Sequence, residues 1–261
     1  MFEKRFYYLV KFQFLGYRYH GWQKQSNVKT LHAVIDRTLK YILNGTKFKT
    51  LAAGRTDAKV SAEIAAFELF LFNQPLEDFE LFIKEFNKNL PQDIKVISIE
   101  KVDSTFNIIK DSKYKEYHYV FSEGEKCHPF CSPIITSILE TLDIKTMKVG
   151  ANLFNGLHNF KSYCYKPSET GVYLREIKKC ELVENNVYTA NFFPKKSYLL
   201  RVIGKGFGRH QIRLMMGALI MLGKSEISLN YIKNSLKIES DIKIDYIAPA
   251  NGLILNNIEF N

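Results

Sequence analysis

The stretch KFKTLAAGRTDAKVSAEIAAFELFLF, residues 47–72, decides the fold. Its two ends, residues 47–53 and 64–72, are mostly apolar and predict two neighbouring strands. Between them, residues 54–57 read Gly-Arg-Thr-Asp, a dense polar cluster enclosed by apolar sequence. Since glycine permits a tight turn, we expect a polar loop that presents the arginine and the aspartate at a strand end. The aspartate could instead only cap the following turn, and the arginine could simply be solvated.

The residues on either side of this stretch predict an α+β half. Apolar residues alternate over residues 8–14, which indicates a strand. Helical spacing begins after Thr30, a suitable N-cap, and a second helical stripe over residues 81–90 stops at Pro91. With a further strand expected over residues 95–102, the order is strand, helix, strand, strand, helix, strand.

The second half, after a joint near residues 103–115, has a related but less regular pattern. Helices are expected around residues 142–153 and 207–222, and Asn185-Asn186 is a credible hairpin turn. The expected strands cover residues 116–122, 174–184, 187–193, 198–203 and 253–260. The sequence therefore predicts two α+β halves joined through a common sheet.

Charge points to a polyanionic partner. The 37 Lys and Arg exceed the 27 Asp and Glu by 10, and the sequence pI is near 9.2. A lysine-rich genome and an evenly solvated surface would give the same balance. No run of 18 apolar residues exists to cross a membrane, and the N-terminus lacks a signal-peptide pattern, so we expect a cytoplasmic protein.

The four cysteines are too few for a disulfide scaffold in 261 residues, so reduced thiols are expected. Cys127, His128 and Cys131 could supply zinc ligands. No second ligand pair with zinc-site spacing occurs elsewhere, and we therefore expect no metal.

Two further segments combine basic residues with apolar or aromatic ones. Residues 205–213 open an apolar helix, and Arg209 and Arg213 lie one turn apart on it. Because an arginine among apolar neighbours is costly to bury alone, we expect a carboxylate to pair with it. In residues 17–24, Tyr17, Tyr19 and Trp22 alternate with basic side chains, which fits either core packing or an RNA-facing rim.

These segments resemble the signatures of the tRNA pseudouridine synthase A (TruA) family. Residues 54–62 are similar to its GRTDxGVHA segment, so that its catalytic aspartate falls on Asp57. Residues 207–217 match its arginine helix and place the active-site arginine on Arg213, and residues 106–119 place the active-site tyrosine on Tyr117. Further similarity covers residues 14–25, 156–160 and 248–253, in family order along nearly the whole chain.

Four departures from the family pattern bear on the substrate more than on the chemistry. Lys59 stands where the family usually has glycine, and Ser61 stands where it has histidine. Ile109 replaces an arginine and Leu15 an aspartate. The first two changes put the backbone geometry and the neighbouring contacts of the aspartate loop in question.

The resemblance implies an α+β fold of two ferredoxin-like or RRM-like halves that share an extended, mostly antiparallel sheet with a central basic cleft. Residues 1–105 would carry the aspartate loop, and residues 106–261 the active-site tyrosine and arginine. The implied enzyme is an isomerase that converts uridine to pseudouridine in the anticodon arm of tRNA. It needs no cofactor, and the family forms homodimers that clamp the RNA.

Within that reaction, Asp57 would act as nucleophile or as base. Arg213 would pair with it, and Tyr117 would stack under the displaced base. Arg55 would enter the RNA stack when the target base is extruded. The expected RNA-binding residues are Arg18, Lys24, Arg55, Lys59 and Arg209. The same chemistry on another tRNA position, on rRNA or on mRNA stays open, as does a non-catalytic RNA-binding module.

Overall fold

The computed structural model describes residues 4–261, which form two compact units. Unit 1 comprises Met1–Lys113 and Leu255–Asn261, and unit 2 comprises Tyr114–Ile254. Both units combine strands and helices; the pairings of β1 with β3 and β4, β2 with β3, β5 with β9, β7 with β8 and β8 with β9 are antiparallel, and that of β5 with β6 is parallel. The fold class is therefore α+β, as the sequence predicted.

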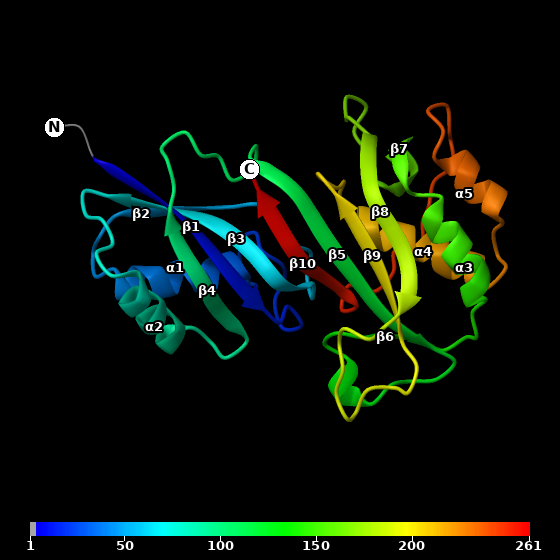
Figure 1. The fold of residues 1–261 in the computed structure, drawn as a ribbon, viewed down its shortest axis with the longest axis horizontal. Helices are drawn as coiled ribbons and strands as arrows, with labels where there is room; N and C mark the ends of the chain where they lie inside the picture. Colours follow the sequence, from blue (N-terminus) through cyan, green and yellow to red (C-terminus); the bar gives the residue numbers. More distant parts are fainter. Residues whose placement is uncertain (1–3) are drawn as a thin grey trace. The chain divides into compact units, whose positions relative to one another are not determined.

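Unit 1 has the predicted order of strands and helices (Figure 1). Its elements are β1 (Arg5–Phe14), α1 (Leu31–Ile42), β2 (Phe48–Ala52), β3 (Ser61–Phe72), α2 (Phe79–Asn89) and β4 (Ile94–Lys101), followed at the end of the chain by β10 (Leu253–Phe260). The hydrogen-bonded order is β4-β1-β3, and β2 pairs with β3. This arrangement places β1 and β3 at the centre of the sheet.

The alternation in β1 determines which face of the sheet the helices cover. Tyr8, Val10 and Phe12 are buried, and the Tyr8 ring contacts Phe79 of α2 edge to face at 5.8 Å between centroids. Thr30 caps α1 by accepting a hydrogen bond from the backbone of Ala33, as predicted. The predicted apolar stripe of α2 is only partly buried, because Leu81 is 55% exposed.

Unit 2 is built around a second antiparallel set of strands (Figure 1). Its elements are β5 (Ser112–Glu123), β6 (Thr136–Ile138), α3 (Ile144–Asn152), β7 (Gly156–Asn159), β8 (Leu174–Glu184), β9 (Tyr198–Gly204), α4 (Gln211–Gly223) and α5 (Leu229–Ser235), with short 3-10 turns at Pro129–Cys131 and Lys161–Tyr163. The order is β5-β9-β8-β7, and β6 pairs with β5 in parallel.

Three expectations for unit 2 were wrong. Asn185-Asn186 is not a hairpin turn between adjacent strands, since β8 ends at Glu184 and β9 begins only at Tyr198. Residues 187–193 form no strand, because the Asn185 side chain accepts from the backbone of Val187 and Tyr188 and so replaces a strand partner. The helix expected from residue 207 begins only at Gln211, since His210 has a left-handed backbone (φ 59°) that a helix cannot contain.

Candidate active site

The aspartate loop between β2 and β3 is fastened to residues 16–22. The backbone N–H of Lys59 donates to the carbonyl of Tyr19 at 3.0 Å, and that of Trp22 donates to Thr56 at 3.2 Å. Ser61, which is buried, accepts from the Gly16 N–H at 2.9 Å. Asp57 itself is half-buried. Bonds from both sides thus fix the loop that presents the carboxylate.

Two glycines make this close approach possible. A Cβ on Gly16 would lie 1.8 Å from the carbonyl oxygen of Val60, and one on Gly21 would lie 2.4 Å from that of Thr56. Gly21 also has a φ of +80°, which side-chain-bearing residues rarely adopt. Two motifs that lie far apart in the sequence therefore form one tightly packed structure around Asp57.

The two departures in the loop have different structural consequences. Lys59 adopts a φ of 68°, the left-handed conformation that suits the glycine usual in the family. The backbone path of a glycine is therefore kept, and the Lys59 ammonium lies 5.8 Å from the centre of the exposed Tyr17 ring. Ser61 supplies the bond to Gly16 described above, so it anchors the loop from inside.

The basic side chains of residues 17–24 are engaged with carboxylates. Arg18 forms an ion pair with Asp93, and Lys24 forms one with Asp36. The Tyr19 hydroxyl also donates to Asp93 at 2.7 Å. Burial disfavours ionisation of Asp93, but the bonds from Arg18 and Tyr19 outweigh it and hold the pKa of this carboxyl below its usual range.

For the aromatic residues of the same segment, the sequence left two interpretations open, core packing and an RNA-facing rim, and the structure differs from one residue to the next. Tyr19 and Trp22 are only 1% and 5% exposed and belong to the core, where Trp22 stacks on His32 at 5.0 Å. Tyr17 is 42% exposed. Arg55 is exposed at the tip of the aspartate loop, where a side chain can reach a bound molecule.

In unit 2, Tyr117 lies on β5 and is half-buried. Its ring meets that of Phe207 edge to face at 5.2 Å. Tyr119, two residues further on the same face, is buried and donates to the carbonyl of Pro249 at 2.8 Å. Lys115 precedes Tyr117 on this face, and burial lowers the pKa of its ammonium group. Sequence reasoning missed Lys115 and Phe207 as neighbours of the tyrosine.

Arg213 lies in the first turn of α4 and is tied to the segment before β10. Its Nε donates to the carbonyl of Ala248 at 2.7 Å, and the Ala248 N–H donates to the carbonyl of Arg213 at 3.1 Å. A Cβ on Gly217, one turn further along α4, would lie 1.9 Å from the carbonyl of Tyr246. This close packing leaves the Arg213 side chain little freedom to move.

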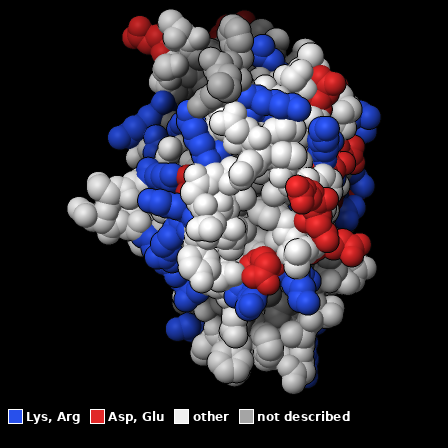
Figure 2. Space-filling view, turned by 90° about the vertical axis from the view of Figure 1, so that its left-hand side faces the viewer, with Lys and Arg blue, Asp and Glu red and all other residues white. Residues whose placement is uncertain are grey.

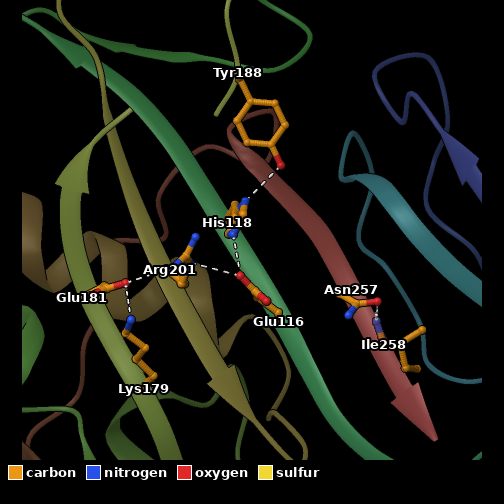
Figure 3. A network of polar contacts seen from close by, with 8 residues as sticks. All are labelled: Glu116, His118, Lys179, Glu181, Tyr188, Arg201, Asn257 and Ile258. Carbon is orange, nitrogen blue, oxygen red and sulfur yellow. Dashed lines mark hydrogen bonds and ion pairs between the residues drawn. The ribbon is translucent and has the colours of Figure 1, made fainter. Parts of the chain in front are cut away.

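A ladder of charged side chains braces the opposite face of β5 (Figure 3). Glu116 accepts from His118 at 2.8 Å and lies 3.1 Å from Arg201 of β9, which contacts Glu181 of β8 at 3.3 Å. Burial lowers the pKa of His118 despite the neighbouring Glu116. Because Glu116 and His118 flank Tyr117 in the strand, the ladder holds the backbone of the tyrosine in place. The sequence offers only the alternation of charged residues as a signal for it.

Arg209 lies just before α4 and packs against an aromatic ring. Its guanidinium is 5.0 Å from the centre of the Tyr165 ring, and His210 stacks on that ring at 4.8 Å. Lys166 also lies 5.5 Å from it. Arg209 and Lys166 are exposed, so their charge is accessible to an anion. Tyr165 and Lys166 are further residues that sequence reasoning missed.

The side chains considered as metal ligands, Cys127, His128 and Cys131, form hydrogen bonds within the protein, and His128 Nδ1 accepts from the backbone of Phe130 at 3.2 Å. Cys127 bonds Ser122 at 2.8 Å, and Cys131 donates to the carbonyl of Phe192 at 3.3 Å. Among residues 4–261, no three His, Cys, Asp or Glu side chains gather as a metal site would require. Within the same residues, no helix has the length and apolar character needed to span a membrane.

Comparison with known proteins agrees with these features. Residues 151–261, which include Arg213, match a family model described as tRNA pseudouridine synthase. A "tRNA pseudouridine synthase A" of Mesoplasma florum is 32% identical over 98% of this chain and 99% of its own length. The relative in Phytoplasma mali is 31% identical over 98% of this chain and 99% of its length, and "tRNA pseudouridine synthase A 2" of Bacillus cereus is 29% identical over 97% and 99%.

A relative of this similarity over nearly the whole chain defines the class, which is that of the pseudouridine synthases. Within that class, the chain belongs to the tRNA pseudouridine synthase A family. The predicted family resemblance is thereby confirmed.

Proposed function

We propose that this chain isomerises uridine to pseudouridine in the anticodon arm of tRNA and that Asp57, Tyr117 and Arg213 carry the reaction. The family makes the chain an isomerase of tRNA uridines. The position within the tRNA and the roles of the three residues are the finer part of the proposal. The observation that carries it is the aspartate loop, which two separate motifs of the chain fix from both sides.

The reaction exchanges one bond for another without net oxidation. The C–N bond between ribose and uracil breaks, the uracil turns, and a C–C bond forms between the ribose and carbon 5; carbon 5 loses its proton, and the nitrogen released from the ribose gains one. A carboxylate such as Asp57 can attack as a nucleophile or remove a sugar proton as a base. Either role requires a fixed carboxylate, which the hydrogen bonds of the loop support.

Tyr117 and Arg213 have complementary roles in the proposal. The half-buried Tyr117 ring provides a flat apolar surface under the displaced uracil, and Phe207 limits its rotation. Arg213 is held by Ala248, and it is the residue that the family resemblance pairs with the reacting carboxylate, which its planar guanidinium would orient. Arg55, exposed beside Asp57, is suited to filling the gap that an extruded base leaves.

The decisive experiment is release of tritium from tRNA labelled at carbon 5 of uridine. The wild-type protein should release it, and Asp57→Asn should slow the release by about 10³-fold or more, with RNA affinity kept within a few-fold. Glu63→Gln removes an exposed carboxylate from β3 nearby and serves as the matched control, with an unchanged rate. Substantial turnover by Asp57→Asn would disprove the assignment.

Mapping of pseudouridine in the product tests the target site. Modification of anticodon-arm uridines supports the proposal, whereas modification confined to another tRNA region, rRNA or mRNA contradicts it. We also propose a cytoplasmic homodimer, in keeping with the family. Light scattering on the active protein should give twice the mass of one chain, and a fully active monomer would contradict the dimer.

A further inference from the structure

The face of the unit 1 sheet that α1 and α2 leave uncovered carries two rows of side chains at the end remote from the aspartate loop. Strand pairing sets Tyr7 of β1 opposite Phe70 of β3, and Phe70 opposite Lys49 of β2. The next row joins Arg5 to Phe72. Tyr7 and Arg5 alternate with the helix-facing Tyr8, so both rows lie on the open face.

Aromatic rings and cations contact one another within these rows. The Tyr7 and Phe70 rings meet edge to face at 5.6 Å, and the Lys49 ammonium lies 5.8 Å from the centre of the Phe70 ring. Arg5 and Lys47 lie 5.5 Å and 4.9 Å from the centre of the Phe72 ring. We call these six residues, Arg5, Tyr7, Lys47, Lys49, Phe70 and Phe72, the basic–aromatic face.

On β1 and β3, the next row of the same sheet face is closed. Leu9 and Glu68, the next row after Tyr7 and Phe70, are buried beneath a cluster that includes Ile108. The rings of the basic–aromatic face, by contrast, are only half-buried, and Arg5 and Lys49 are exposed. The opening is therefore confined to one end of the central strands.

Three cations, Arg5, Lys47 and Lys49, lie on this face, each near an aromatic ring. Arg5 and Lys49 are exposed and each lies near a ring, and the charge of Lys49 also acts on the buried carboxyl of Glu68. Figure 2 views the molecule from the side on which β2 and the start of β1 lie in Figure 1, and Lys and Arg form a band along one edge of that surface. A surface that presents exposed cations beside aromatic rings favours an anionic partner.

We propose that the basic–aromatic face is a second RNA-binding surface, which stacks unpaired bases of the substrate RNA on Tyr7, Phe70 and Phe72. Aromatic residues on the two central strands of a four-stranded sheet are a general means of binding single-stranded RNA. A base stacked on a ring contributes more than an exposed cation on the same ring. The lysines can therefore exchange their rings for phosphates when RNA binds.

The proposal rests on the RNA substrate proposed above and adds a contact remote from the reacting uridine. In β3, Phe70 lies nine positions after Ser61, which is next to the aspartate loop. At about 3.3 Å per residue this is roughly 30 Å. RNA held at both places must extend along the sheet, so the face would contribute to affinity for a large RNA rather than to the chemical step.

Two pairs of substitutions separate stacking from charge. Phe70→Leu with Phe72→Leu keeps apolar volume but removes the rings, and should weaken binding of a tRNA transcript at least about 5-fold with an unchanged salt slope. Arg5→Gln with Lys49→Gln should weaken it and reduce the slope of log K against log salt by about 1.4, or 0.7 for each phosphate contact. Lys84→Gln, an exposed lysine of α2, is the control and should change neither quantity.

Three further measurements make the test decisive. A tRNA containing 4-thiouridine should crosslink to the peptide that holds Phe70 and Phe72, and the lost conversion of the double variants should return at saturating tRNA. If wild-type protein converts tRNA while all variants bind it equally well, this surface is refuted and the proposed function stands. If the variants instead change the oligomeric state with unaltered RNA affinity, the face contacts another copy of the chain and the proposal is wrong. A wild-type protein that releases no tritium would refute the proposed function independently.

Discussion

The two ends of β3 carry basic and aromatic side chains in similar numbers but use them in opposite ways. At the Ser61 end, Arg18 and Lys24 are held by Asp93 and Asp36, and glycines leave no space for a single added carbon. At the Phe72 end, Arg5 and Lys49 lie against rings, and no carboxylate of the described residues forms an ion pair with either of them. The first end is suited to holding the carboxylate of Asp57 rigidly, and the second to exchanging its contacts for a ligand.

The largest effect expected in this comparison concerns the rigid end. Gly21→Ala should destabilise the protein by about 3 kcal/mol and abolish activity, since its Cβ would meet the Thr56 carbonyl at 2.4 Å. Gly45→Ala is the matched control, because its φ of +93° carries the same left-handed strain but its Cβ meets nothing within 4 Å. The control should lose only about 1 kcal/mol. Urea unfolding compares the two, and equal losses would show that the packing at Gly21 is not critical.

The next prediction contrasts a paired cation with an unpaired one. Arg18→Gln should cost about 1 kcal/mol of stability, whereas Lys49→Gln should leave stability almost unchanged. The pKa of Asp93 is lowered in the folded protein, so the contribution of the pair is present above its ordinary value of 3.8 and is lost as pH falls through the folded pKa. Thermal unfolding between neutral and acidic pH checks both statements. A Lys49→Gln loss as large as that of Arg18→Gln would contradict the distinction.

Glu68 lies between the closed and open parts of the sheet face, and we expect its substitution to stabilise the protein. Its carboxyl is 1% exposed, accepts one long bond from Ile108 at 3.5 Å, and has a second oxygen without a hydrogen-bond partner among the described residues. Burial raises its pKa. Glu68→Gln should therefore stabilise the protein at neutral pH by about 1 kcal/mol.

The pH dependence gives this prediction its sign. Below the ordinary pKa of 4.5 the carboxyl is protonated in both folded and unfolded chains, so glutamine offers no electrostatic advantage there. As pH rises, the unfolded chain ionises first and the wild type loses stability relative to the variant. Chemical unfolding at several pH values should show a gain that grows with pH. A gain independent of pH would indicate that packing, and not ionisation, is responsible.

The smallest expected effect lies in the aspartate loop. Lys59→Gly should relieve the strain of the left-handed backbone at this position. Glycine also gains conformational entropy in the unfolded chain, which opposes this effect, and the net stabilisation should be about 0.5 kcal/mol. Lys29→Gly, an exposed lysine without positive φ, should lose stability and is the control. Calorimetry resolves the difference. If Lys59→Gly destabilises, the contact of Lys59 with Tyr17 outweighs the strain.

The sequence by itself determined the elements of unit 1, the aspartate loop and the family. Alternation in β1, the Thr30 cap and the enclosed Gly-Arg-Thr-Asp are local patterns, and local backbone preferences suffice to form them. It failed at residues 187–193, where an apolar run resembled a strand but a single asparagine side chain satisfied its backbone.

Only the tertiary structure decided which charges are compensated. Arg18 pairs with Asp93, 75 positions away in the sequence, and Lys24 pairs with Asp36, 12 positions away. Glu116 pairs with Arg201, 85 positions away. The basic–aromatic face likewise exists only after three strands have paired in one register. A charge–charge or cation–ring contact depends on the distance between two side chains in space. The hydrophobic periodicity of one strand carries no information about which other strand of the chain will pair with that strand.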